Sequence, residues 1–293
     1  MSPQDRFVDI GFNLHLREWP GPKTPFVLLH GLSSNSRTWD AVGDALAQAG
    51  HRVIAVDQRG HGLSDKPDSG YGFDQVTADL ARLLASLALE QPILVGQSWG
   101  GNVVLEFGAR YPAAACGLVF VDGGFLDLHS RPDASWEKIS VELKPPPLAG
   151  MPRTELAARI RDFHPDWAEF GIEATLANFE TLPDGTIRPW LSLDRHLAIL
   201  RAMWEQRPAA LFPQISAPTL ICVAEVPGNA RWPELKAKQV AAAQAGLSQA
   251  AVHWFENTDH DIHVHRPGAL VQLLLDTLQN GFWAGCAHQT NSG

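Results

Sequence analysis

Short apolar runs alternate with longer segments of helical character along the first 121 residues. In the clearest helical segment, residues 73–87, apolar side chains recur every three or four positions and so line one helix face. This alternation predicts a parallel sheet with helices on both faces. The predicted strands are Phe26–Leu29, Val53–Val56, Ile93–Val95, Leu118–Val121, Ala217–Val223 and Ala251–Phe255; a last helix is expected over Pro267–Phe282.

The middle of the chain breaks this rhythm, because no strand pattern follows residue 124 until residue 217. Helical segments are expected there instead, at Glu155–Phe163, Trp167–Phe179 and Leu193–Glu205. The last ten residues are small and polar. We therefore predict an α/β core formed by residues 1–124 and 213–283, an inserted helical cap at 125–212 and a flexible tail at 284–293.

Composition and charge narrow the range of partners. The net charge is −9, and 45% apolar and 19% charged residues are ordinary values for a globular protein, so nothing favours nucleic acid or an anionic membrane. No stretch approaches the roughly 18 apolar residues of a membrane span, and the first residues do not resemble a secretion signal. We expect a cytoplasmic protein. Cys116, Cys222 and Cys286 have no C-x-x-C spacing, and we predict that they are inert free thiols.

The stretch Gly96-Gln97-Ser98-Trp99-Gly100 follows a predicted strand and opens a predicted helix. A serine in this position, with a glycine two residues to either side, can occupy a cramped turn that exposes its hydroxyl above the sheet. The motif alone is weak, since a tight turn capped by a serine gives the same letters. Its position between strand and helix makes Ser98 a candidate nucleophile.

Four landmarks occur in order: His30-Gly31-Leu32, the turn Asp57–Ser64, the Ser98 motif, and His260 after the last strand. With them the chain resembles the α/β-hydrolase superfamily, and the resemblance covers nearly all of the chain outside the cap and tail. It implies a mostly parallel sheet of about eight strands, helices on both faces and an inserted helical cap. The turn Asp57–Ser64 is expected to pack beneath the Ser98 turn as a structural element.

The resemblance is to the capped branch of this superfamily, which includes esterases, lactonases, carbon–carbon bond hydrolases, haloalkane dehalogenases and epoxide hydrolases. Dehalogenases and epoxide hydrolases of this fold use an aspartate nucleophile, and epoxide opening also uses tyrosines of the cap. Here the nucleophile position holds Ser98, and the only tyrosines, Tyr71 and Tyr111, precede the cap. Acyl transfer through a serine ester is the expected chemistry.

His260 is the predicted general base, because a loop after the last strand can hold its imidazole above the strand ends near Ser98. The base needs a carboxylate to orient it. The commonest family position, just after the seventh strand, offers Glu225 but no aspartate, whereas Asp122 matches the alternative position used by some dehalogenases and lactone hydrolases. We favour Asp122, with Glu225 as the alternative acid and Asp127 as a further candidate.

The oxyanion is expected to bind the backbone N–H groups of Leu32 and Trp99. Aromatic residues are frequent in and around the cap, and they predict a largely apolar pocket for a hydrophobic small-molecule substrate. A metal site formed by the acidic and histidine residues around His260 is not expected, since one short loop rarely supplies convergent ligands. The residues proposed for the pocket wall are Phe125, Trp204 and Trp232.

The expected function is cofactor-free hydrolysis of carboxylic esters or lactones through an acyl-enzyme on Ser98. The same residues would also serve a carbon–carbon bond hydrolase, an amidase or a perhydrolase, because one fold supports several leaving groups. A hydrolase-fold receptor that binds a small apolar ligand with little turnover is a third alternative.

Overall fold

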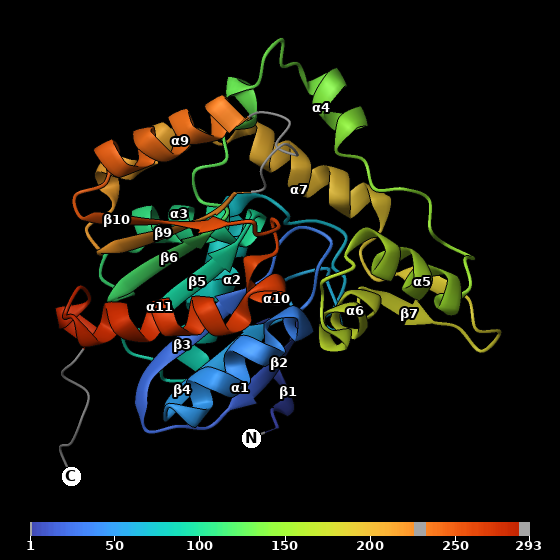
Figure 1. The fold of residues 1–293 in the computed structure, drawn as a ribbon, viewed down its shortest axis with the longest axis horizontal. Coiled ribbons are helices and arrows are strands. Elements are labelled where there is room, and N and C mark those ends of the chain that lie inside the picture. Colours follow the sequence, from blue (N-terminus) through green and yellow to red (C-terminus); the bar gives the residue numbers. More distant parts are fainter. Residues whose placement is uncertain (1, 226–232, 287–293) are drawn as a thin grey trace.

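The computed structural model of the protein describes residues 2–225 and 233–286. Within them, eight strands form a sheet in the order β1-β2-β4-β3-β5-β6-β9-β10 (Figure 1). β2 pairs antiparallel with β1 and β4, and the other neighbours are parallel, which confirms the mostly parallel sheet. The strands are β1 (Gln4–Asp9), β2 (Asn13–Trp19), β3 (Lys23–Leu29), β4 (His51–Val56), β5 (Ile93–Gln97), β6 (Gly117–Val121), β9 (Thr219–Glu225) and β10 (Ala250–Glu256).

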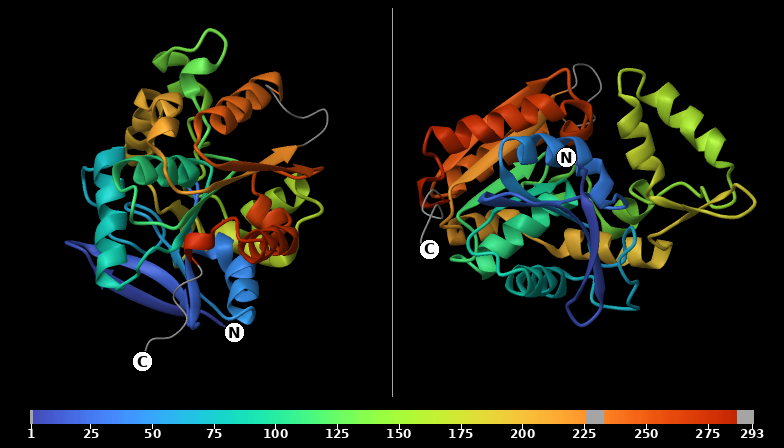
Figure 2. Two further views of the ribbon diagram at one scale, coloured as in Figure 1. Left: turned by 90° about the vertical axis from the view of Figure 1, so that its left-hand side faces the viewer. Right: turned by 90° about the horizontal axis from the view of Figure 1, so that it is seen from below.

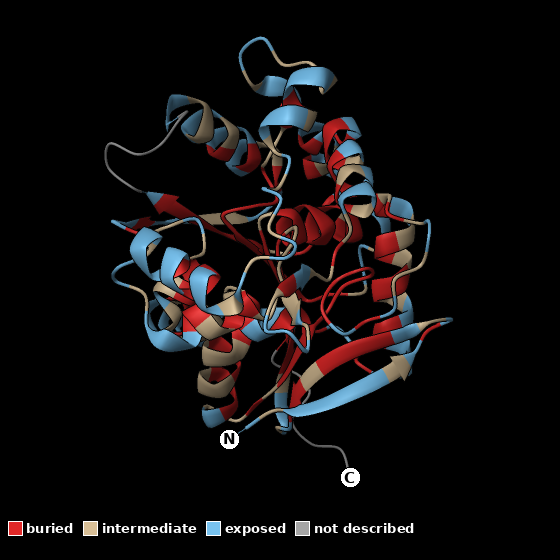
Figure 3. Ribbon diagram, turned by 90° about the vertical axis from the view of Figure 1, so that its right-hand side faces the viewer, coloured by how far each residue is buried: buried red, intermediate tan, exposed pale blue. Residues whose placement is uncertain are grey.

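Alternate residues of the central strands enter two separate cores, as the two-residue period of a strand requires. In β3, Phe26 and Leu28 face one core, and Val27 and Leu29 face the other. Helices cover both cores (Figure 2), and the buried residues concentrate between these layers, whereas the edge strand β1 is exposed (Figure 3). The first core is covered by α1 (Asp40–Gln48), α10 (Ile262–His265) and α11 (Pro267–Gln279), and the second by α2 (Phe73–Ser86), α3 (Trp99–Arg110) and α9 (Pro233–Gly246).

Between β6 and β9 the chain forms two groups of elements. In the first group, Ile139 and Ile199 join the core on the α3 side of the sheet. The second group has a small core of its own that contains Ile160 and Ile172, and it projects beside the sheet (Figure 2). The first group contains α4 (Trp136–Glu142) and α7 (Leu193–Glu205), and the second contains α5 (Arg153–Phe163), α6 (Glu169–Leu176), β7 (Phe179–Thr181) and β8 (Ile187–Pro189).

The pair β7–β8 corrects the expectation that the whole insertion is helical. The predicted helix Trp167–Phe179 ends at Leu176, and Phe179 begins a strand. The pair closes through a turn in which Asp184 Oδ1 accepts the N–H of Thr186 at 2.9 Å. Strands of three residues are too short to give a recognisable alternating pattern. Short elements connect the rest: η1 (Ser36–Trp39), η2 (Leu128–Ser130), α8 (Pro208–Leu211), η3 (Phe212–Gln214) and η4 (Ala284–Cys286).

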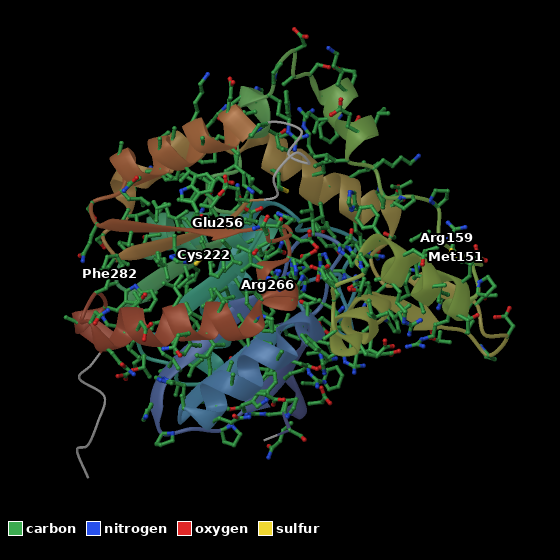
Figure 4. The ribbon with its side chains drawn as sticks, in the orientation of Figure 1. Met151, Arg159, Cys222, Glu256, Arg266 and Phe282 are labelled. Atoms are coloured by element: carbon green, nitrogen blue, oxygen red, sulfur yellow. A yellow bond between two sulfur atoms is a disulfide. The ribbon has the colours of Figure 1, made fainter. Side chains whose placement is uncertain are left out.

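The start of the predicted flexible tail is fixed to the core. Cys286, in η4, forms a disulfide with Cys116, so the predictions of free thiols at these two positions and of a flexible tail from residue 284 were wrong. The two cysteines are 170 residues apart, and spacing along the chain gave no sign of the bond. Residues 287–293 of the predicted tail lie outside the described residues. Cys222 is a free thiol buried in the sheet (Figure 4), and burial raises its pKa, which fits the predicted inert thiol.

Among the helices that the structure describes, none is both long enough and apolar enough to cross a bilayer. The cytoplasmic location stays a prediction.

Candidate active site

Ser98 occupies a strained turn between β5 and α3. Its backbone has φ 51° and ψ −119°, a conformation that costs a residue with a side chain free energy and that occurs mainly at functional positions. The N–H of Ser98 donates to the Val121 carbonyl at 3.0 Å, and the Ser98 carbonyl accepts from the N–H of Gly101 at 3.0 Å. These bonds fix the turn between the end of β6 and the start of α3.

Close backbone contacts explain the glycines around this turn. A Cβ atom on Gly96 would lie 2.1 Å from the carbonyl oxygen of Gly100, a distance that no real Cβ tolerates. A Cβ atom on Gly31 would lie 2.3 Å from Gln97 Oε1 and 3.2 Å from the Cβ of Ser98. The turn that follows β3 therefore lies directly against the Ser98 turn.

His260 and Asp122 are 138 residues apart in sequence and share a hydrogen bond of 2.6 Å between Nδ1 and Oδ2. Asp122 directly follows β6, and its side chain is 3% exposed. His260 lies in the loop after β10; its imidazole is half exposed and lines the same cavity as Ser98. Among the described residues, Nε2 of His260 has no hydrogen-bond partner.

Lys236, on α9, is a further partner of Asp122 that the sequence analysis missed. Its Nζ lies 2.7 Å from Oδ1 and 2.9 Å from Oδ2 of Asp122, and it also donates to the carbonyl of Ala224 at 2.6 Å. The N–H of Ala224 donates to Oδ1 of Asp122 at 3.0 Å. Both carboxylate oxygens are thus held in place. Lys236 is one of several polar residues of α9, and the sequence gave no sign of which one faces the sheet.

The other candidate acids lie elsewhere. Glu225 is exposed at the end of β9, and within the described residues its carboxylate makes no hydrogen bond or ion pair with His260. Asp127 accepts the N–H of His129 at 2.9 Å and so caps the short helix η2. Of the three candidates, Asp122 is the one that lies against the imidazole.

The pKa values of Asp122 and His260 are shifted in opposite directions. Burial raises the pKa of Asp122, but the hydrogen bond and charge of His260 and the charge of Lys236 outweigh burial and hold that pKa below its usual value. For His260, burial lowers the pKa, but the hydrogen bond and charge of Asp122 and the charge of Asp261 together outweigh burial and leave the pKa above its usual value. The charge of Lys236 opposes protonation of His260. The geometry therefore stabilises an imidazolium beside a carboxylate.

The two proposed oxyanion donors are available. Among the described residues, the backbone N–H groups of Leu32 and Trp99 have no hydrogen-bond acceptor. The indole of Trp99 is buried, and the ring of His61 stacks on it with a centroid distance of 5.3 Å. This contact places the Asp57–Ser64 turn against the Ser98 turn, and Nε2 of His61 also accepts the N–H of Ser33 at 3.3 Å, so His61 has a structural role.

A cavity of about 210 Å³ is lined by Ser98, His260 and residues of the cap. Phe125 and Trp204 do not line it: Phe125 is buried in the core, and Trp204 stacks on His129 with a centroid distance of 3.6 Å. They fill the space between α4, α7 and the sheet, because that part of the insertion has to bury its own apolar face. Trp232 lies outside the described residues.

Most of the residues that line this cavity have polar side chains, so the expectation of a largely apolar pocket does not hold for it. The sequence analysis did not foresee this, because the cap contributes one aromatic side chain, Trp167, to the lining, and its other contributions there are polar. The polar side chains include Ser33, Ser34, Thr38, Gln97, Thr175 and Asn178.

The loop that carries His260 is bonded to the cap. Oδ2 of Asp259 accepts the indole N–H of Trp167 at 3.0 Å and lies 3.0 Å from Nδ1 of His164. Nε2 of His265 lies 2.7 Å from a carboxylate oxygen of Asp166. Both cap residues His164 and Trp167 line the cavity. In the part of the chain that the structure describes, no three His, Cys, Asp or Glu side chains come together as a possible metal site.

An eight-stranded sheet of this order, with helices on both faces, is an α/β-hydrolase fold. The chain belongs to the alpha/beta hydrolase family, a family of enzymes whose model matches residues 26–273. In sequence it is similar to 2-(acetamidomethylene)succinate hydrolase of Mesorhizobium japonicum, with 40% identity over 118 residues, or 40% of this chain and 42% of that protein. It is also similar to a non-heme haloperoxidase of Rhodococcus erythropolis, with 33% identity over 133 residues, or 45% and 48% of the two chains.

The matched stretches span less than half the length of these curated relatives. Among solved structures, the crystal structure of E-2-(acetamidomethylene)succinate hydrolase superposes with a TM-score of 0.78 over 94% of this chain and 99% of that chain, at 23% identity. At this identity the likeness concerns the fold.

Proposed function

We propose that this protein is a serine hydrolase that cleaves carboxylic esters or lactones through an acyl-enzyme on Ser98. One observation carries the proposal: Ser98 and His260 line one cavity, while the bond to Asp122 occupies Nδ1 of His260 and leaves Nε2 without a partner among the described residues. A base in this arrangement can accept a proton from a serine hydroxyl.

In the first half of the reaction, Nε2 of His260 takes the hydroxyl proton as Oγ of Ser98 attacks the carbonyl carbon. The negative charge that develops on the carbonyl oxygen accepts hydrogen bonds from the N–H groups of Leu32 and Trp99. When the tetrahedral intermediate collapses, the carbon–oxygen bond of the ester breaks and His260 returns the proton to the leaving alcohol. The acyl group is then bound to Ser98 as an ester.

In the second half, His260 removes a proton from water, and the resulting hydroxide attacks the acyl carbon. Collapse of this second intermediate breaks the bond to Ser98, which regains its proton from His260, and releases the carboxylic acid. Throughout, Asp122 fixes the imidazole tautomer and stabilises the imidazolium, while Lys236 and the N–H of Ala224 hold the carboxylate.

The proposal is tested with a short-chain nitrophenyl ester and a fluorophosphonate label. We expect turnover by the wild type, stoichiometric labelling of Ser98, and a fall in kcat/KM of at least about 10⁴-fold in Ser98→Ala. Ser216→Ala is the matched control, because this exposed serine lies at the opposite end of the sheet, just before β9. Turnover that survives in Ser98→Ala would refute the mechanism.

Amide hydrolysis is the second candidate, because the name of the relative 2-(acetamidomethylene)succinate hydrolase includes an acetamido group. The steps are the same, except that His260 must protonate a leaving amine. Comparing kcat/KM for phenyl acetate and acetanilide separates the two functions. If the ester is preferred by about the same factor as in the uncatalysed hydrolyses, ester chemistry is favoured. If kcat/KM for acetanilide approaches that for phenyl acetate, an amidase is favoured.

A further inference from the structure

Asp261 is a carboxylate at the catalytic cavity that the proposed mechanism does not use. It follows His260 directly and lines the cavity with Ser98. Among the described residues, its carboxylate has neither a hydrogen-bond partner nor an ion-pair partner. Other polar side chains of the lining are engaged: the Ser33 hydroxyl bonds with His196 at 2.8 Å, and the Thr175 hydroxyl donates to the Gly171 carbonyl at 2.9 Å.

No local structural role accounts for this carboxylate. Asp261 precedes the short helix α10, a position where an aspartate commonly accepts a backbone N–H of the first turn, but its side chain makes no such bond. Asp259, two residues earlier, contrasts with it, because its carboxylate accepts the indole N–H of Trp167 and contacts His164. One aspartate of this loop holds the cap, and the other is left facing the cavity.

The surroundings make a lone carboxylate costly. Burial raises the pKa of Asp261, the positive forms of His260 and His164 lower it, and the charges of Asp259 and Asp122 raise it further, so that the pKa lies above the usual value. An ionised carboxylate in this position therefore destabilises the folded state. A donor supplied by a ligand would relieve that cost.

We infer that Asp261 is a specificity residue, and that the substrate is a small ester bearing a hydroxyl or ammonium group that donates to the Asp261 carboxylate. This inference rests on the proposed function and narrows its substrate class. The cavity volume of about 210 Å³ is below the roughly 300–1,000 Å³ of most small-molecule sites, which fits a short acyl or alcohol part.

The charges at the cavity also exclude a class of substrate. Among the described residues, its lining includes no lysine or arginine, and Asp261 adds a negative charge. A substrate carboxylate would be desolvated there beside the charge of Asp261, with no lysine or arginine of the described lining to pair with it, which is unfavourable. The substrate class therefore differs from the succinate that the name of the relative contains.

Three methyl esters of equal size, methyl butanoate, methyl 3-hydroxypropanoate and methyl β-alaninate, test the inference together with the slightly larger monomethyl succinate. A pair of acetates, propyl acetate and 2-hydroxyethyl acetate, places the hydroxyl on the alcohol part instead. Each kcat/KM is measured by pH-stat at pH 7 and divided by the rate of hydroxide-catalysed hydrolysis, which removes inductive effects. In at least one of the two series, we expect the donor-bearing ester to exceed its apolar counterpart by about tenfold or more, and monomethyl succinate to be the poorest substrate.

Variants then assign the preference to one side chain. Asp261→Asn should lower the ratio of donor-bearing to apolar ester by about tenfold, whereas Asp162→Asn, an exposed aspartate of α5 outside the cavity, should leave the ratio unchanged. The Tm of Asp261→Asn at pH 7 should equal or exceed that of the wild type, because the variant removes a destabilising charge. A structural role would lower the Tm instead.

The two proposals fail in different ways. If Ser98 is labelled by the fluorophosphonate but the apolar esters are preferred in both series, the inference is overturned and the serine mechanism stands. The same holds if Asp261→Asn leaves the ratio of donor-bearing to apolar ester unchanged. Absence of both labelling and ester turnover overturns the proposed function and the inference together.

Discussion

The protein contains two histidine–aspartate pairs with nearly the same contact and very different surroundings. In one, Nδ1 of His260 lies 2.6 Å from Oδ2 of Asp122; in the other, Nδ1 of His15 lies 2.8 Å from Oδ2 of Asp57. Both aspartates follow a strand of the central sheet, and both carboxylates are 3% exposed. A hydrogen bond between imidazole and carboxylate is therefore not enough to define a catalytic group.

The second nitrogen of each ring separates the two pairs. His15 is 2% exposed, and its Nε2 lies 3.2 Å from Asp5, so both ring nitrogens contact carboxylates. His260 is half exposed at a cavity that also exposes Ser98. The carboxylates differ as well, since Asp57 also accepts the N–H groups of Ser36 and Leu63 and so organises a turn. In the proposed mechanism the first pair transfers a proton to and from the substrate, whereas the second has both ring nitrogens engaged and is expected to stabilise the fold.

Neutralising each aspartate tests this division, and the larger effect is expected at Asp122. Asp122→Asn should lower kcat by about 10⁴-fold, because an amide cannot stabilise the imidazolium and favours the wrong tautomer. Steady-state kinetics with a nitrophenyl ester measures it, with Glu225→Gln as the matched control that should change kcat little. The opposite pattern would transfer the acid role to the end of β9.

Asp57→Asn should act on stability instead. Removing the charge from this buried pair should cost about 3–5 kcal/mol of unfolding free energy, measured by urea denaturation at pH 7, while the kcat of the folded fraction stays near the wild-type value. Burial raises the pKa of Asp57, but His15 and the backbone donors outweigh it and hold that pKa well below the usual range. Its stabilisation is present above the unfolded pKa of about 3.9 and is lost as the pH falls toward the folded pKa.

The difference in stability between wild type and Asp57→Asn should therefore shrink below about pH 4. If kcat fell as far in Asp57→Asn as in Asp122→Asn while stability was unchanged, the distinction between the two pairs would be lost.

The sequence could indicate Ser98 and His260 because each depends on local order: a serine between strand and helix, and a histidine after the last strand. The sequence could offer Asp122 only as one of three candidate acids. The choice among them depends on the position of the imidazole of His260, which lies 138 residues from Asp122 in the sequence. Lys236, 114 residues from Asp122, and the Cys116–Cys286 bond depend on long-range packing alone. The polar lining of the cavity was missed for a related reason. Phe125 and Trp204 were assigned to the pocket wall, but both are buried in the core on the α3 side of the sheet.

The smallest predicted effect concerns how Lys236 tunes the catalytic pair. Because the pKa of His260 is raised and the base must be neutral, kcat/KM should fall on the acid side with a midpoint above about pH 6.5. Lys236→Met removes a charge that opposes protonation of His260, and it leaves Asp122 a stronger acceptor, so both effects raise that pKa. The midpoint should move to higher pH by up to about one unit, whereas Lys238→Met, an exposed lysine of the same helix, should leave it in place. A midpoint that moved to lower pH in Lys236→Met would mean that this lysine acts on the pair by some means other than its charge.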